Sequence, residues 1–408
     1  MTSFPTTHYG VPLEFAIFAA MLAGVALFHR RAFSIALTGL VVVLLFQGTV
    51  GAFPAGEGLG ALAAHAAHEW VILANLMLLL VGFELLSNQF EQSNLPGHMP
   101  GLLPDNWTGG VALLAVVFGL SAFLDNIAAA VIGGVMARHV YRGRVGVGFL
   151  AAIVASANAG GAGSVIGDTT TTMMWLDGIA ASEVLHAYVA AAAAFCVFAV
   201  PAARQQHRHS PIVKSASAAP PIDGPRLVIV GAMLAAAIAT NLALNLSAPA
   251  AADRFPFLGA AVWVALLVCA PWRRPRWDLV PEAARGSLFL LSLVLAASMM
   301  PVERLPEASW QTAFGLGVVS AVFDNIPLTK LALEAGGFDW GFLAYAVGFG
   351  GSMIWFGSSA GVALSSRFPE ARSAIAWIKG GWHVALAYVI GFAVMLALLG
   401  WHPPAGRP

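Results

Sequence analysis

The sequence has 408 residues, of which 20 are Lys or Arg and 20 are Asp or Glu, so only 10% carry a charge. A soluble domain ordinarily has about 25% charged residues, whereas this chain is 59% hydrophobic. So few charges cannot cover so much apolar surface in water, which excludes a soluble enzyme, a disordered regulator and a secreted module. The balanced charge and the lack of a basic stripe also exclude nucleic acid as a partner and leave membrane lipid as the expected surroundings.

Apolar segments follow one another along the whole chain, and most are long enough to cross a membrane. They lie near 11–28, 33–50, 70–87, 109–137, 147–176, 185–201, 226–246, 257–271, 286–301, 311–335, 341–365 and 382–400. Residues 51–69 are rich in Gly and His and are expected to form an interfacial helix. The pattern predicts an all-α polytopic membrane protein.

Several apolar segments carry polar residues, Gly or Pro at their centres and are too long for one straight span. Irregular backbone at membrane depth is tolerated only where protein or a cavity surrounds it. We therefore expect re-entrant hairpins at 109–137 and 311–335, and broken helices at 147–176 and 341–365. With the hairpins re-entrant, most Lys and Arg residues fall on one side, which the positive-inside rule makes cytoplasmic, and both termini fall on the outer side.

A repeated pattern relates the two halves of the chain. Ser-Ala-x-x-Asp-Asn-Ile occurs at 121–127 and again at 320–326, and each copy is followed by Gly-Gly, five residues and Gly. The hairpins open to opposite sides in this interpretation, so the halves are inverted-topology repeats, the construction typical of secondary transporters. The predicted domains are N-terminal scaffold helices, a first repeat core, a cytoplasmic linker, second-half scaffold helices, and a second repeat core with the last helix, at 1–108, 109–201, 202–225, 226–310 and 311–408.

Asp and Asn stand at the expected tip of each hairpin, at Asp125-Asn126 and Asp324-Asn325. These residues can cap the following half-helix. A charge at the bilayer centre is nevertheless costly unless it is compensated, so a carboxylate there also indicates an ion path. Carboxylate, amide and carbonyl oxygens together suit a hard monovalent cation such as Na⁺.

The stretch from Asn158 to Thr172 is the richest in polar residues. Its glycines permit unwound backbone. Asp168 is followed by Thr169 and Thr170, and the side-chain oxygens of these residues can cap a helix or bind an ion. A Gly-rich packing face would explain the glycines but leaves Asp168 unexplained. Ser358 takes the place of Asp168 in the second repeat, so the ion site is expected to be asymmetric.

Three further ionisable residues are candidates for modulating the site. Lys330 is expected to pair with a carboxylate, to act as a counter-charge or proton carrier, or to reach the outer interface. Glu334 is four residues further on and is suited to an ion pair with Lys330 along a helix. Glu84 is a proton-linked carboxylate or an interfacial acid.

These motifs resemble those of the NhaD-type sodium/proton antiporters, within the larger ion transporter superfamily that includes di- and tricarboxylate carriers and arsenite-type exporters. The similar stretches occur in the family's order and span most of the chain. They are GFELLSNQ (82–89), SAFLDNIAAA (121–130), NAGGAGSVIGDTTTTMMWL (158–176), SAVFDNIPL (320–328), GFGGSMIWFGSSAGVA (348–363) and WIKGGWHVALAYVIGF (377–392).

The resemblance implies a homodimer with a scaffold and a mobile transport region, and outward Na⁺ or Li⁺ flow coupled to inward H⁺ flow. It implies functional roles at Asp125, Asn126, Asn158, Asp168, Thr170, Asp324, Asn325 and Ser358. Two departures weaken a Na⁺ site: Ala128, Ala129 and Ala130 replace the threonines that members tend to carry, and Lys330 replaces an apolar residue.

The sequence thus predicts a membrane transporter, not an enzyme, of the plasma or inner membrane. It exchanges Na⁺ or Li⁺ for H⁺, with Asp125, Asp168 and Asp324 binding cation and proton in competition. No cofactor is expected. Cys196 and Cys269 are lone thiols in apolar runs, which argues against a disulfide framework or a zinc site. The rivals are a carboxylate or oxyanion carrier, favoured by Lys330 and half-helix N-termini, and a channel or membrane-embedded enzyme.

Overall fold

The computed structural model describes residues 12–28, 31–49, 52–53, 56–213, 221–247 and 254–404. Apart from the two-residue strands β1 (Ala52–Phe53) and β2 (Gly56–Glu57), the regular structure of these residues is helical. Within them, six helical segments are long and apolar enough to cross a membrane: Ala32–Thr49, Gly58–Glu91, Ala181–His209, Gly224–Leu244, Trp277–Ser298 and Trp382–Leu399. The predicted all-α polytopic membrane fold is confirmed.

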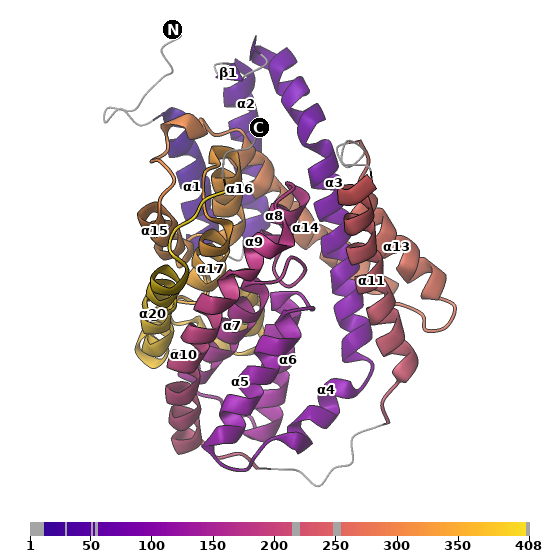
Figure 1. Cartoon of the computed structure of the whole chain (residues 1–408), viewed down its shortest axis with the longest axis vertical. Helices are drawn as coiled ribbons and strands as arrows, with labels where there is room; N and C mark the ends of the chain where they lie inside the picture. Colours follow the sequence, from indigo (N-terminus) through magenta and orange to yellow (C-terminus); the bar gives the residue numbers. More distant parts are fainter. Residues whose placement is uncertain are drawn as a thin grey trace.

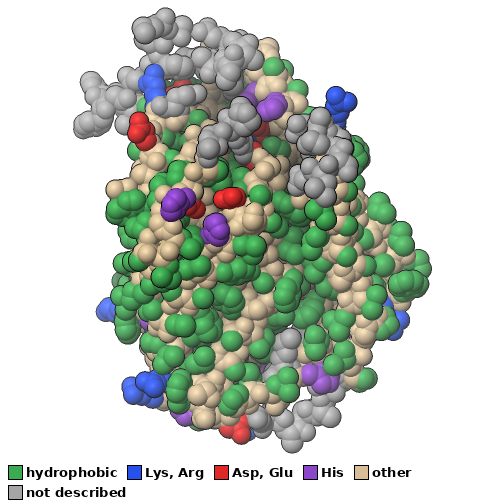
Figure 2. Space-filling model, in the orientation of Figure 1, with side chains coloured by type: hydrophobic (Ala, Val, Ile, Leu, Met, Phe, Trp, Pro, Cys, Tyr) green, Lys and Arg blue, Asp and Glu red, His purple; other side chains and the backbone are tan. Residues whose placement is uncertain are grey.

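The surface agrees with this class. Hydrophobic side chains cover the middle of the face shown in Figure 2, and the Lys and Arg side chains lie toward its upper and lower ends. Large apolar side chains on the long helices are exposed, among them Leu45, Val228 and Leu398. Such a belt is stable against lipid tails and not against water.

The chain begins with α1 (Leu13–Leu27) and α2 (Ala32–Thr49), which pack on each other, and continues into α3 (Gly58–Glu91). The prediction of a separate interfacial helix at 51–69 is wrong: residues 52–53 and 56–57 form the β1–β2 hairpin, and residues 58–69 are the first turns of α3. The run from Ala61 to Ala67 consists largely of Ala, a strong helix former, so nothing ends the helix there. In Figure 1, α3 runs through much of the molecule's height, with α11 and α13 beside it.

After α4 (Leu95–His98) and the 3₁₀ turn η2 (Met99–Leu102), a hairpin forms from α5 (Trp107–Ser121) and α6 (Asn126–Val140). The next helix is broken into α7 (Val147–Ala162) and α8 (Thr169–Leu176). The short helix α9 (Ala181–Leu185) then leads into α10 (Ala187–His209).

The second half begins with α11 (Gly224–Ser247), α13 (Phe257–Cys269), η3 (Trp277–Leu279) and α14 (Val280–Ser298), followed by η4 (Val302–Arg304). Another hairpin follows, made of α15 (Trp310–Ser320) and α16 (Asn325–Ala335). A second broken helix consists of α17 (Trp340–Gly350) and α18 (Ser359–Arg367). The chain closes with η5 (Pro369–Arg372), α19 (Ala374–Gly380) and α20 (Trp382–Leu399).

Each hairpin packs closely on the broken helix that follows it. A Cβ at Gly160 of α7 would collide with the carbonyl oxygen of Phe118 in α5, and a Cβ at Gly350 of α17 would collide with that of Gly317 in α15. α7 and α17 lie in the centre of the molecule, because every residue from 148 to 162 and from 340 to 350 is buried. The α5–α6 hairpin lies in the lower half of Figure 1 and α16 in the upper half. The inverted orientation of the two halves in a membrane stays a prediction.

The predicted linker at 202–225 is shorter than expected. α10 continues to His209, because Ala202, Ala203 and Gln206 form a buried face that packs on the core. Residues 210–213 and 221–223 are the described part outside helices, and residues 214–220 lie outside the described residues. The predicted positions of the chain's two ends, at 1–11 and 405–408, lie outside them as well.

Candidate functional site

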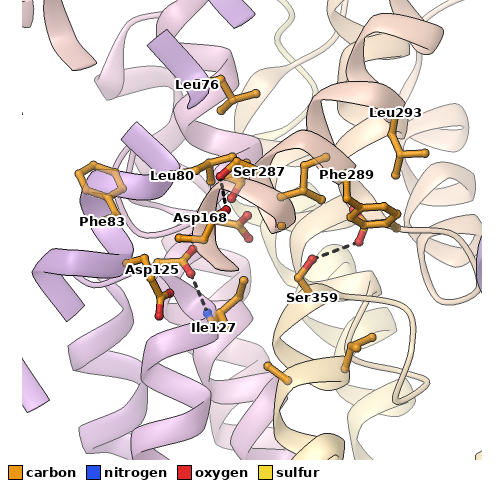
Figure 3. A pocket seen from close by; sticks show the side chains of 18 of the residues that line it. Leu76, Leu80, Phe83, Asp125, Ile127, Asp168, Ser287, Phe289, Leu293 and Ser359 are labelled. Carbon is orange, nitrogen blue, oxygen red and sulfur yellow. Dashed lines mark hydrogen bonds between the residues drawn. The ribbon is translucent and has the colours of Figure 1, made fainter. Parts of the chain in front are cut away.

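A cavity of about 520 Å³ lies where the two halves of the chain meet. Asp125, Asp168 and Asp324 all line it, although they are far apart in the sequence. α3 and α14 provide much of the remaining wall, which is largely apolar. The structure therefore brings the three predicted carboxylates to one cavity. Figure 3 shows Asp125 beside Asp168, with Ser359 across the cavity.

Two of the carboxylates cap the helices that begin at the hairpin tips. Asp125 accepts a hydrogen bond from the backbone N–H of Ile127 at 3.3 Å (Figure 3), and Asp324 accepts one from Ile326 at 3.1 Å. Each cap satisfies one of the free N–H groups of a helix start and leaves a second carboxylate oxygen. In Asp324 this second oxygen accepts a hydrogen bond from Ser359 Oγ at 3.2 Å.

Asp168 caps α8 but has an unsatisfied atom. Its Oδ1 accepts from the Thr170 backbone N–H at 3.0 Å, and the side chain is only 2% exposed. Within the part of the chain that the structure describes, Asp168 Oδ2 and Thr170 Oγ1 are buried and have no hydrogen-bond partner. Both atoms face Gly348 of α17, where a Cβ would lie 3.3 Å from Asp168 Oδ2 and 4.0 Å from Thr170 Oγ1.

Buried polar groups are normally satisfied, so two buried oxygens that face the same glycine without a hydrogen bond require an explanation. A bare cation would provide one: it contacts several oxygens at once and neutralises a carboxylate. A proton on Asp168 would also neutralise the charge. The arrangement is therefore chemically able to hold either a proton or a small cation.

The other threonines have mainly structural contacts. Thr171 Oγ1 donates to the carbonyl of Ser164, at 2.5 Å, and Thr172 Oγ1 donates to that of Val165, at 3.0 Å. These bonds tie α8 to the unwound stretch before it. Thr169 lines the cavity next to Asp168.

Buried amides link the two halves behind the cavity. Asn126 Nδ2 donates to Asn158 Oδ1 at 3.1 Å, and Asn158 Nδ2 lies 2.9 Å from Ser352 Oγ and 3.1 Å from Ser358 Oγ. Ser358 itself caps α18 through Gly361 N–H. Asn158 is therefore a bridge between α6 of the first half and the α17–α18 break. Asn325, which begins α16, is also buried.

Lys330 does not line the cavity, and its ammonium group forms ion pairs with two carboxylates. Its Nζ is 2.9 Å from Glu69 Oε2 and 2.6 Å from Glu334 Oε1. The predicted helical pair of Lys330 with Glu334 is thus present, and the alternative in which Lys330 reaches the outer interface is wrong, because its side chain is 3% exposed. Glu84 is exposed on α3 and lines the cavity.

Sequence reasoning missed Glu69, Glu282 and Ser352. Glu282 lines the cavity near Glu84, but it is an exposed residue of α14 and no sequence motif surrounds it. Ser352 is next to the second Gly-Gly pair, which was a usable signal. Glu69 pairs with Lys330, 261 positions away, and no local sequence pattern predicts a contact over that distance.

Known proteins point to the same chemistry. No protein-family model matches the chain. The chain is similar to sodium/proton antiporters. It is 27% identical over 292 residues to the Arabidopsis thaliana protein named sodium/proton antiporter 1, which covers 61% of this chain and 48% of that protein. It is 26% identical over 307 residues to sodium/proton antiporter 2 of the same plant, covering 64% of this chain and 69% of the relative. The chain thus spans about half the length of the first of these relatives.

Proposed function

We propose that this membrane protein is a secondary active transporter that exchanges Na⁺ or Li⁺ for H⁺. The observation that carries the proposal is the pair of buried, unsatisfied oxygens on Asp168 and Thr170, next to a cavity that Asp125 and Asp324 also line. The similarity to proteins named sodium/proton antiporters supports it. An NhaD-type antiporter is the specific form that the sequence motifs favour.

Competition for carboxylates couples the two ions in this proposal. A cation at Asp168 loses its water and needs negative charge and oxygen ligands in return, which Asp168 Oδ2 and Thr170 Oγ1 supply. A proton on the same carboxylate removes the charge that attracts the cation. Each half of the transport cycle therefore carries either the cation or protons past Asp125, Asp168 and Asp324, in opposite directions, and competition for the carboxylates is sufficient to couple the two.

The remaining candidate residues position this centre. Asn126, Asn158 and Ser358 hold the two broken-helix regions together by side-chain hydrogen bonds. Asn325 and Thr169 lie directly beside Asp324 and Asp168 in the chain. Because the site lies between the two halves, movement of the repeat cores against the scaffold helices would expose it to either side in turn.

The proposal includes an orientation and an assembly. The basic loops face the cytoplasm, the termini lie outside, and the protein works as a homodimer in the lipid bilayer of the plasma or inner membrane. The end of the cavity that Glu84 and Glu282 line then faces the cytoplasm. Arg285 and the basic residues before it lie at the same end of α14 as Glu282, and basic loops are cytoplasmic.

An anion carrier is less well supported. Lys330 is the residue that favours an anion, and Glu69 and Glu334 already neutralise it. The polar lining of the cavity includes five carboxylates, from Glu84, Asp125, Asp168, Glu282 and Asp324. Such a lining repels anions and attracts cations.

Purified protein in liposomes tests the proposal. A pH gradient is imposed and reported by a fluorescent dye, and Na⁺, Li⁺, K⁺ and choline are added in turn. Exchange predicts that Na⁺ or Li⁺ collapses the gradient and that choline does not. Uptake of a labelled dicarboxylate, with no response to any cation, would instead establish the anion carrier.

A further inference from the structure

A buried ion-paired cluster lies outside the candidate ion site. Lys330 Nζ is within 2.9 Å of Glu69 Oε2 and 2.6 Å of Glu334 Oε1. The side chains of Lys330 and Glu69 are 3% and 5% exposed, whereas that of Glu334 is 31% exposed. The pair between Lys330 and Glu69 joins α16, whose first turn is capped by Asp324, to the long helix α3.

Two hydrogen bonds near the ion pairs connect further helices in the same region. One turn before Glu69, His65 Nε2 lies 3.0 Å from Ser298 Oγ at the end of α14. Gln47 Nε2 of α2 donates to the carbonyl of Met299 at 2.7 Å. At this level α2, α3, α14 and α16 are therefore joined by polar contacts.

The cluster lies beyond one end of the cavity. The lining of the cavity on α3 runs from Leu76 to Glu84, and on α14 from Glu282 to Leu293. At 1.5 Å per helical residue, Glu69 lies about 10 Å beyond Leu76, and Lys330 lies about 9 Å along α16 from Asp324. The exposed residues Glu84 and Glu282 mark the opposite end.

A buried ion pair is a weak source of stability, since apolar side chains of similar volume usually do as well. It differs from an apolar contact in that both charges regain favourable hydration when water enters. Such a pair suits a contact that must break and re-form. Lys330 and Glu69 join a helix that carries a site carboxylate to a helix of the surrounding wall, which is where transport requires movement.

We infer that Glu69, Lys330 and Glu334 form the barrier that closes the ion path at the end opposite Glu84. Lys330 leaves Glu69 when the three aspartates become accessible from that end, and it returns when they face the Glu84 end. The inference rests on the proposed transport function, because a barrier of this kind has a role only in alternating access.

Accessibility of a single cysteine tests the barrier. The native Cys196 and Cys269 are replaced by Ala, and Leu76→Cys places a thiol in the cavity wall on the barrier side. Oriented proteoliposomes are treated with a membrane-impermeant thiol reagent from each side separately. The variants are Glu69→Gln/Lys330→Met, which removes both charges together, Lys330→Arg, which keeps the pair, and Lys379→Met, which removes an exposed cation elsewhere.

The double variant should be labelled from the barrier side about tenfold faster than its parent, which corresponds to a closed state weakened by about 1.4 kcal/mol. Lys330→Arg and Lys379→Met should keep the parent's rate. An unchanged barrier-side rate in the double variant, with labelling from the Glu84 side retained as proof of folding, would overturn the inference. An equal increase in Lys379→Met would also overturn it.

A milder variant covers the case in which the double variant does not fold. Glu334→Gln alters the partly exposed member of the cluster, and it should raise the barrier-side rate in the same direction; an unchanged rate counts against the barrier. Labelling does not depend on ion exchange. Absence of Na⁺/H⁺ exchange with an intact, one-sided labelling pattern would therefore refute the proposed ions and leave the barrier as part of a transporter of another substrate.

Discussion

Asp168 differs from the other two cavity carboxylates because one buried oxygen has no protein partner within the described residues. Replacing it by Asn removes the charge and keeps the side-chain oxygen that caps α8. We expect Asp168→Asn to fold and to lose exchange. Na⁺ at about 100 times its Kd should stabilise the wild type by about 2.7 kcal/mol and should leave the variant's melting temperature unchanged.

Thermal unfolding in detergent with and without Na⁺ measures this difference, and choline chloride controls for ionic strength. Glu370→Gln is the matched control, because it removes an exposed carboxylate in η5, away from the cavity lining. It should keep the Na⁺ effect. A variant Asp168→Asn that Na⁺ still stabilises would show that the cation binds elsewhere.

Gly348 leaves space in front of the unsatisfied oxygens. A methyl group there would lie 3.8 Å from Ala162 Cβ and 4.0 Å from Thr170 Oγ1, which are ordinary contacts. It would lie only 3.3 Å from Asp168 Oδ2, so the Asp168 side chain would have to shift slightly. Gly348→Ala should therefore fold but bind Na⁺ at least about tenfold more weakly, a loss of about 1.4 kcal/mol. The smaller Li⁺ should lose less. Titration of exchange rate with each ion checks this, and equal losses for both ions would argue against a size-limited site.

Asn158 has contacts that its neighbour Ser156 lacks. Asn158→Ala would leave the buried hydroxyls of Ser352 and Ser358 without this donor, and we expect a loss of about 1–3 kcal/mol of stability. Ser156 is equally buried on α7, but its Oγ has no partner among the described residues. Ser156→Ala should be neutral or slightly stabilising. Melting temperatures of the two variants check the difference, and similar values would show that the amide bridge does not stabilise the fold.

At the scale of elements, Gly→Ala substitutions at two positions distinguish the effect of close helix packing on stability from the effect of helix propensity. Gly160→Ala would force α5 and α7 apart at the Phe118 carbonyl, with an expected cost of about 1–3 kcal/mol. Gly231 of α11 has open space around it, so Gly231→Ala should stabilise slightly, because Ala is the better helix former. Thermal unfolding of both variants measures the contrast. Equal stability would mean that α5 and α7 can separate without cost.

The helix breaks were readable from the sequence because each has a local cause. Asp125 and Asp324 both precede a helix start that they cap, and the motif around them occurs twice. The continuation of α3 through 58–69 and of α10 to His209 was missed. α3 continues through an Ala-rich run that favours helix, a local signal that the Gly- and His-rich composition obscured. α10 continues because Ala202, Ala203 and Gln206 are buried against other helices, and the sequence does not report that burial.

At the scale of the whole molecule, the site depends on contacts between distant parts of the chain. The carboxylates were predictable because they stand in apolar segments, where a charge is costly. Three features could not be predicted. They are the arrangement of the carboxylates around one cavity, the bridge between Asn158 and Ser358, which are 200 residues apart, and the pair of Glu69 with Lys330. Such pairings arise from tertiary packing, which a single sequence does not encode in any local pattern.

The central claim is coupled exchange of a cation for protons, and uphill Na⁺ movement tests it most directly. Proteoliposomes with an acidic lumen are placed in a more alkaline medium with equal Na⁺ on both sides, with the membrane potential clamped by K⁺ and valinomycin. The account predicts that radioactive Na⁺ accumulates in the lumen above the outside concentration as protons leave, and that Asp168→Asn abolishes the accumulation. Equilibration without accumulation in the wild type would indicate a channel and contradict the account.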